Sequence, residues 1–244
     1  MLETLKNMVR DKFSIKTKLC LAGALGIILG IGIGWAVFHK QPLVVQQVVG
    51  QQYGPMRMVW IESQARQLPA NGATVFLGDS LTDGLLLPDN QGDMLNAGVA
   101  GARVADALTL AKRLLDSLKP ATVIVTIGVN DTSRSQFDAV AFRDNYLELC
   151  DTIEGVGSKL IISTLLPIEK DKQFGKYFNQ ERIIECNNII RSIASTKSIE
   201  LLDAFAYFAD SEGYMPKDMT VDGVHLAAQT YVLWKQLMLQ KLGM

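Results

Sequence analysis

Residues 73–81, ATVFLGDSL, decide how this chain folds, because an apolar run suited to a buried strand ends abruptly in a polar turn. The same arrangement recurs along the chain, where short apolar segments alternate with amphipathic segments of helical period. Strands are predicted near 73–77, 94–96, 121–127, 160–165 and 199–202, and helices near 55–68, 103–118, 137–153, 178–196 and 226–241. This alternation predicts an α/β fold with a parallel sheet covered by helices on both faces.

The residues directly after each predicted strand are the candidates for a functional site, because ligands of doubly wound sheets bind outside the carboxyl ends of the strands. Four polar blocks occupy these positions. They are GDSLTDG from Gly78, NAGVAG from Asn96, GVND from Gly128, and DGVHL from Asp222 in the loop that follows the last strand.

Ser80 is the candidate nucleophile among these residues, because a serine hydroxyl becomes reactive when a neighbouring base removes its proton. His225 is the one histidine beyond His39 and is therefore the candidate base. Asp222 lies three residues earlier, so a single turn can bring its carboxylate to Nδ1 of the imidazole while Nε2 faces Ser80. These residue types predict a Ser-His-Asp triad.

The four blocks closely resemble those of the GDSL or SGNH hydrolase family, whose Ser, Gly, Asn and His occur in this order. The matching residues are Ser80, Gly101, Asn130 and His225. The resemblance covers residues 55–244 and implies a three-layer α/β/α, flavodoxin-like fold with five parallel strands. It also implies an oxyanion hole formed by the backbone N–H groups of Ser80 and Gly101 and the side-chain amide of Asn130. Nothing in the sequence points to a metal or cofactor.

Other residues near the predicted site are expected to support it. Gly101 allows the backbone itself to approach the substrate, and Gly98 in the same turn is the alternative for that role. Three other carboxylates are expected to support the loops through hydrogen bonds, since the triad already has its acid. They are Asp79, Asp83 and Asp131.

The resemblance indicates an ester hydrolase of the acylesterase or deacetylase type but leaves the substrate open. Only 15 residues separate Ser80 from Asn96, which leaves little room for a large lid and favours a small acyl group on an O-acylated envelope glycan. A site held near a membrane favours lipid esters instead, as in a lysophospholipase or thioesterase. Transfer of the acyl group to a glycan hydroxyl and a non-catalytic binding module are the other functions considered.

Residues 19–38 form an uncharged apolar segment of 20 residues, which spans about 30 Å as a helix, the thickness of a bilayer core. No small-residue cleavage site follows before Lys40, so we expect a transmembrane signal anchor instead of a cleaved signal peptide or a buried helix. Basic residues concentrate in residues 1–18, which the positive-inside rule places in the cytoplasm. The catalytic domain is then predicted on the extracytoplasmic side of the inner (cytoplasmic) membrane, which in a Gram-negative bacterium is the periplasmic side.

The predicted membrane segment and the chain behind it suggest two further features. Gly26, Gly30 and Gly34 recur every four residues and could pack two such helices into a homodimer. Residues 39–54 are predicted to be an extended tether, because 41–54 carry no charge and no helical period. The hydrolase domain is expected to begin at residue 55.

Charge and cysteine content exclude several classes of protein. Residues 1–40 carry a net charge of +4 and the rest of the chain −5, which argues against nucleic acid as a partner. Three cysteines, Cys20, Cys150 and Cys186, are too few and too scattered for a zinc site or a disulfide framework. Cys150 and Cys186 are expected to be buried thiols. A disulfide between them is the alternative, because their helices are predicted to lie side by side.

Overall fold

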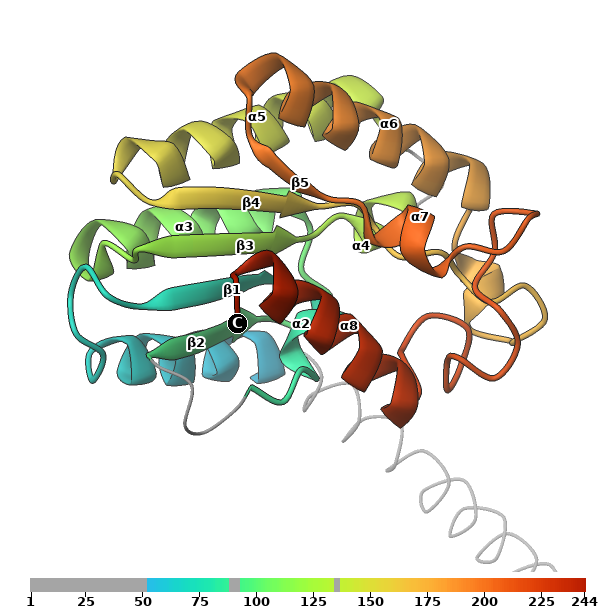
Figure 1. The fold of residues 1–244 in the computed structure, drawn as a ribbon, viewed down its shortest axis with the longest axis horizontal. Helices are drawn as coiled ribbons and strands as arrows, with labels where there is room; N and C mark the ends of the chain where they lie inside the picture. Colours follow the sequence, from blue (N-terminus) through green and yellow to red (C-terminus); the bar gives the residue numbers. More distant parts are fainter. Residues whose placement is uncertain (1–51, 88–92, 134–136) are drawn as a thin grey trace, which may run out of the picture. The chain divides into compact units, whose positions relative to one another are not determined.

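Five parallel strands form the central sheet of this structure, a computed structural model that describes residues 52–87, 93–133 and 137–244. They are β1 (Thr74–Gly78), β2 (Met94–Gly98), β3 (Thr122–Thr126), β4 (Lys159–Ser163) and β5 (Glu200–Leu202). Their order is β2-β1-β3-β4-β5, so the direction of winding reverses between β1 and β3 (Figure 1). The predicted parallel five-stranded sheet is confirmed.

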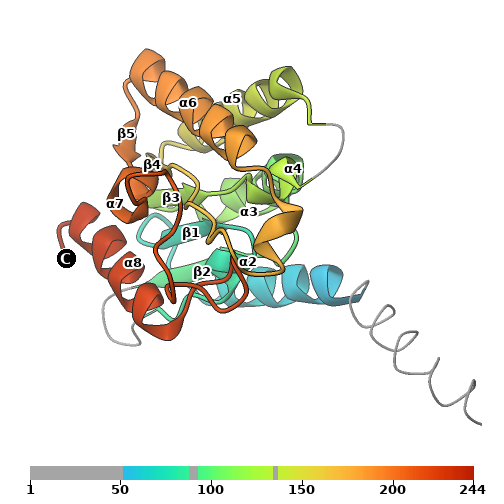
Figure 2. The same ribbon diagram turned by 90° about the vertical axis from the view of Figure 1, so that its right-hand side faces the viewer.

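Helices cover both faces of this sheet and complete the three predicted layers (Figures 1 and 2). One face carries the helical residues 52–65 together with α3 (Val104–Leu118), α5 (Ala139–Gly155) and α6 (Gln180–Lys197). The other face carries α7 (Ala204–Phe208) and α8 (Ala228–Lys241). Figure 2 shows α3 and α5 on one side of the strands and α7 and α8 on the other.

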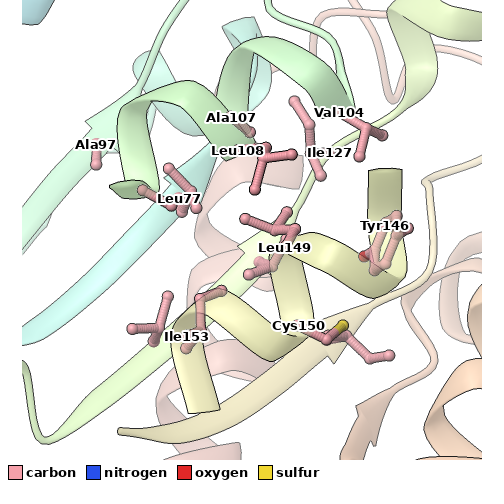
Figure 3. Packing of buried hydrophobic residues seen from close by; sticks show 14 of the residues in the cluster. Leu77, Ala97, Val104, Ala107, Leu108, Ile127, Tyr146, Leu149, Cys150 and Ile153 are labelled. Atoms are coloured by element: carbon pink, nitrogen blue, oxygen red, sulfur yellow. The ribbon is translucent and has the colours of Figure 1, made fainter. Parts of the chain in front are cut away.

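Strand residues alternate between the two cores, as the pleat of a β-strand requires. Val75 and Leu77 of β1 pack into the larger core under α3, α5 and α6, whereas Phe76 between them packs into the smaller core under α8. Figure 3 shows Tyr146, Leu149, Cys150 and Ile153 of α5 entering the larger core. Both faces of the strands are buried, which explains their continuous apolar sequences.

Four short elements escaped the sequence prediction, because three to five residues are too few to show a helical period. They are α2 (Ser80–Asp83), α4 (Val129–Thr132), the 3₁₀ turn Gly175–Tyr177, and α7. The first two begin directly after β1 and β3. They therefore carry the polar residues at the carboxyl edge of the sheet.

Most of the predicted N-terminal features lie outside the described residues. These are the cytoplasmic segment 1–18, the membrane anchor 19–38 with its three glycines, and the tether up to residue 51. In the part of the chain that the structure describes, no helix is both long and apolar enough to cross a lipid bilayer.

Candidate active site

Three side chains form a continuous hydrogen-bonded row at the carboxyl edge of the sheet. Oγ of Ser80 lies 2.9 Å from Nε2 of His225. Nδ1 of the same imidazole lies 2.7 Å from Oδ2 of Asp222. The sequence prediction that Ser80 and the Asp222–His225 loop lie together is therefore matched by the geometry.

Ser80 owes its position to the tight turn that ends β1. The carboxylate of Asp79 caps the short helix α2 by accepting the Leu81 N–H at 3.0 Å. At Gly78, a side chain is excluded, because a Cβ atom would lie 2.5 Å from the Thr126 carbonyl oxygen. The turn thus places the serine hydroxyl at the switch point between β1 and β3.

The carboxylate of Asp222 is oriented by its own loop as well as by the imidazole. Its Oδ1 atom accepts the backbone N–H groups of Val224 at 3.0 Å and His225 at 2.9 Å. Burial alone would raise the pKa of Asp222, but the hydrogen bonds from the His225 ring and from these N–H groups outweigh it and lower the pKa. The carboxylate therefore stays ionised and can stabilise a protonated imidazole.

Glu169, which the sequence analysis missed, holds this loop from outside. This residue follows β4 in the sequence and is only 4% exposed. The carboxylate accepts the backbone N–H groups of Asp218 and Thr220, each at 3.1 Å, and the Thr220 hydroxyl at 2.6 Å. Lys172 completes the cluster with an ion pair at 3.2 Å. Burial opposes the charge, but these partners together lower the pKa of Glu169.

The segment 169–175 also contacts residues 222–225, the triad loop, through its backbone. The Asp222 carbonyl oxygen accepts the N–H groups of Phe174 at 3.1 Å and Gly175 at 3.2 Å. Gly223 has φ +111°, and a Cβ atom there would lie 2.6 Å from the Gly175 nitrogen. Two loops that are about 50 residues apart in sequence are therefore packed backbone to backbone.

Gly101 and Asn130 lie on the two turns that the sequence analysis assigned to the oxyanion hole. Gly101 has φ +79°, with open space around its Cα atom, and no described residue accepts its N–H. Asn130 lies on α4 and donates one amide hydrogen to the Ala102 carbonyl at 2.9 Å, which leaves its second hydrogen for another acceptor.

Gly98, the alternative to Gly101, has a different position. Its N–H donates to Oδ1 of Asn96 at 2.9 Å. A Cβ atom at this residue would lie 2.1 Å from the Asp83 nitrogen. Gly98 is therefore a close-packing position whose donor is already used.

The three additional carboxylates support the surrounding turns, as expected. Besides the Asp79 cap, Asp83 accepts the Ala100 N–H at 3.2 Å and Asp131 accepts the Val104 N–H at 3.3 Å. Burial raises the pKa of Asp79 to about 7 and that of Asp131 to about 6. Both residues are therefore more readily protonated than exposed carboxylates.

Arg57 and Phe174 are two neighbours of the site that the sequence patterns did not reveal. Arg57 forms an ion pair with Asp83 at 2.9 Å and donates to the Gly98 carbonyl at 3.0 Å. The ring of Phe174 stacks on the imidazole of His225, with centroids 5.6 Å apart and an interplanar angle of 21°. Neither residue belongs to a motif, so no local signal could have identified them.

The remaining candidates for chemistry are structural. Cys150 and Cys186 are both buried and unbridged. Burial raises the pKa of Cys150 to about 12 and that of Cys186 further still. In the described ranges, no three His, Cys, Asp or Glu side chains are grouped to hold a metal ion.

Comparison with protein families and known structures places this geometry in context. A profile of the GDSL-like Lipase/Acylhydrolase family matches residues 76–233. A comparison with curated proteins found no match to the sequence.

Several solved structures share the fold at low sequence identity. A GDSL-like lipase from Bacteroides thetaiotaomicron has a TM-score of 0.66 and 20% identity, covering 75% of this chain and 96% of its own. A protein from Streptococcus pneumonia has a TM-score of 0.69 and 18% identity, covering 82% of this chain and 99% of its own. The acetyl xylan esterase AlAXEase has a TM-score of 0.59 and 21% identity, covering 69% and 98%.

Proposed function

This chain belongs to the GDSL-like Lipase/Acylhydrolase family, and from that premise we propose that it hydrolyses carboxylic esters through an acyl-enzyme formed on Ser80. The observation that carries the proposal is the row of hydrogen bonds from Ser80 through His225 to Asp222, at 2.9 and 2.7 Å. A nucleophile, a base and an orienting acid in this arrangement activate a serine for acyl transfer.

In the first half of the reaction, Nε2 of His225 accepts the Ser80 proton as Oγ attacks the ester carbonyl carbon. Asp222 holds Nδ1–H and stabilises the imidazolium. The backbone N–H groups of Ser80 and Gly101 and the Asn130 amide donate to the oxygen on which negative charge develops. His225 then returns the proton to the alcohol oxygen as the ester bond breaks, which leaves the acyl group on Ser80.

In the second half, a water molecule gives a proton to His225 while its oxygen attacks the acyl carbon. His225 then returns this proton to Oγ of Ser80 as the bond between Oγ and the acyl carbon breaks, which releases the carboxylic acid and restores Ser80. A sugar hydroxyl in place of this water would make the protein an O-acyltransferase. Product analysis with and without a carbohydrate acceptor distinguishes the two, because transfer yields a new ester and hydrolysis a free acid.

We also propose that residues 19–38 anchor the enzyme in the inner membrane, with the catalytic domain on the periplasmic side. The support is the uncharged segment of 20 residues and the basic residues that precede it. Gly26, Gly30 and Gly34 would then lie in the bilayer, where close helix packing could form a homodimer.

The decisive experiment is Ser80→Ala in the full-length protein. Removing one oxygen from a partly exposed turn should abolish hydrolysis of aryl acetates while leaving the circular dichroism spectrum and melting temperature unchanged. His225→Ala should be about as damaging, because residues of a triad act as one unit. A folded Ser80→Ala protein that retains substantial turnover would show that another residue is the nucleophile.

A further inference from the structure

We propose that the cavity beside His225 binds the alcohol half of the ester, and that this alcohol is a sugar ring stacked on Phe174 and Tyr177. The inference rests on the hydrolase function proposed above. It adds a residue-level substrate site, and it distinguishes a carbohydrate ester from a lipid ester.

An open cavity of about 620 Å³ has Asp222 in its wall. The segment between β4 and α6 and the triad loop line it together. The lining residues are Lys172, Gln173, Phe174, Tyr177, Val221 and Asp222. Asp222 and Phe174 line this cavity and both contact the His225 ring, so the cavity is adjacent to the candidate active site.

The chemistry of a serine hydrolase decides which half of the ester this cavity receives. His225 must return a proton to the departing alcohol oxygen, so the alcohol has to lie beside the imidazole. The carbonyl oxygen is held elsewhere, by the turns that carry Gly101 and Asn130. The wall of this cavity includes Asp222 and Phe174, the two residues that contact the His225 ring, and neither oxyanion residue. We therefore place the cavity on the side of the leaving group.

Two aromatic rings offer flat surfaces at this position. Phe174 stacks on the imidazole, so its ring extends the surface of His225 into the cavity. Tyr177 lies beside it, with ring centroids 5.9 Å apart and an interplanar angle of 58°. Phe174 is 40% exposed and Tyr177 65% exposed. Large aromatic side chains left exposed at the rim of a site are typical of binding surfaces.

A sugar ring fits this surface better than a lipid does. A pyranose presents C–H bonds on its face and hydroxyl groups around its edge, so the face can cover an aromatic ring while the edge bonds to water or to Gln173. An acyl chain needs an enclosed apolar channel, whereas this cavity is open and has polar residues in its wall. Carbohydrate is therefore the class of alcohol that the lining favours.

The charge of the lining also argues against a phospholipid headgroup. Lys172 is the one cation among the six lining residues. Its ammonium group already pairs with Glu169 at 3.2 Å and donates to the Thr220 carbonyl. A phosphate in this cavity would have to compete with a buried carboxylate for that cation.

The test compares two acetyl esters that differ in the alcohol, together with one lipid ester. Rates of the full-length protein in detergent are measured on 6-O-acetylglucose and ethyl acetate, with lysophosphatidylcholine as the lipid substrate. The wild type should prefer 6-O-acetylglucose to ethyl acetate in kcat/KM. Tyr177→Ala should lower this preference by about fivefold or more, mainly through KM, because it removes one stacking ring. Tyr177→Phe keeps the ring and should retain the preference.

Tyr207→Ala is the matched control, since Tyr207 is a 56% exposed tyrosine on α7 outside the cavity lining. It should change none of the three rates. The inference is overturned if the wild type shows no preference for the sugar ester, if Tyr177→Ala lowers both rates equally, or if its main effect falls on lysophosphatidylcholine. Hydrolysis that persists in Ser80→Ala would instead overturn the proposed function itself.

Discussion

Asn130 shows how one residue combines two hydrogen bonds in the proposed mechanism. One amide hydrogen is bound to the Ala102 carbonyl at 2.9 Å, which fixes the plane of the side chain beside the Gly101 turn. The other hydrogen is then held in a set direction before substrate arrives. Donors that need no reorientation stabilise a developing oxyanion most effectively.

We therefore expect Asn130→Ala to reduce kcat by roughly 10²–10³, the usual loss for one oxyanion donor. KM for an aryl acetate should change much less, because the donor acts mainly on the transition state. Steady-state kinetics of the folded variant measures both constants. An effect confined to KM would assign Asn130 to substrate positioning.

Asp79 is a buried carboxyl group that decreases stability at neutral pH. Burial raises its pKa to about 7 in the folded protein, whereas an unfolded chain has an aspartate pKa of about 3.9. Below about pH 4 the group is protonated in both states and has no cost. As the pH rises from about 4 to about 7, the unfolded state loses its proton first, so the free energy of unfolding falls.

Asp79→Asn should remove this pH dependence, since asparagine keeps an oxygen for the Leu81 N–H but does not titrate. The free energy of unfolding of the variant minus that of the wild type should be about 1–3 kcal/mol larger at pH 8 than at pH 4. Urea unfolding at the two pH values measures this. If the difference in unfolding free energy between variant and wild type were the same at both pH values, the pKa of Asp79 would not be raised in the folded protein.

The segment between β4 and α6 holds the triad loop in place. Glu169 accepts three hydrogen bonds from the strip between Asp218 and Thr220, and Phe174 and Gly175 bond to the Asp222 carbonyl. Without these contacts, movement of the triad loop would displace the imidazole relative to Ser80. Because catalysis depends on hydrogen-bond geometry, this support connects loop packing to turnover.

Glu169→Gln should lower both stability and turnover. It removes the ion pair with Lys172 and places an amide N–H₂ group against backbone donors. We expect the free energy of unfolding to fall by about 1–3 kcal/mol, the cost of a buried unsatisfied group. We also expect kcat, measured well below the melting temperature, to fall about tenfold, because the imidazole loses its fixed position.

Glu212→Gln provides the comparison, because Glu212 is 68% exposed and pairs with Lys170 at the surface. An exposed pair contributes little, so this variant should match the wild type. If Glu169→Gln lost stability but kept its full kcat, Glu169 would serve the fold alone and not the position of His225.

The whole domain depends on the helix at residues 52–65, which packs on the sheet through Ile61 and Ala65. Arg57 of this helix ties it to the turn at Gly98 and to Asp83. These contacts support the turns that follow β1 and β2, and the turn after β1 carries Ser80. The domain therefore includes this helix, and any separation from the proposed membrane segment has to occur before it.

We expect full-length protein to remain in the membrane fraction after high salt and carbonate extraction. A shortened chain that begins at Gln51 should appear in the supernatant with full esterase activity, because every proposed catalytic residue and Arg57 lie beyond that point. A chain that begins at Ala70 should be unstable, because it lacks Ile61 and Ala65 of the core.

The orientation of the proposed anchor has its own test. Protease added to cells with an opened outer membrane should digest the domain, since the positive-inside rule places residues 1–18 in the cytoplasm. A mature protein that begins after residue 38 would contradict the signal anchor. A domain that stays protected until the inner membrane is breached would contradict its orientation.

The sequence alone predicted the order of the five strands and the longer helices and the candidates Ser80, Asp222 and His225. The family resemblance of its short blocks added Gly101 and Asn130. These features depend on local periodicity and on short blocks that follow strand ends, so they are readable from neighbouring residues. The structure alone revealed Glu169, which contacts Thr220 across 51 residues, and Arg57, which contacts Gly98 across 41. It also placed Phe174 on His225. Such contacts form only when segments far apart in the sequence pack together, and a local sequence pattern does not show which segments will do so.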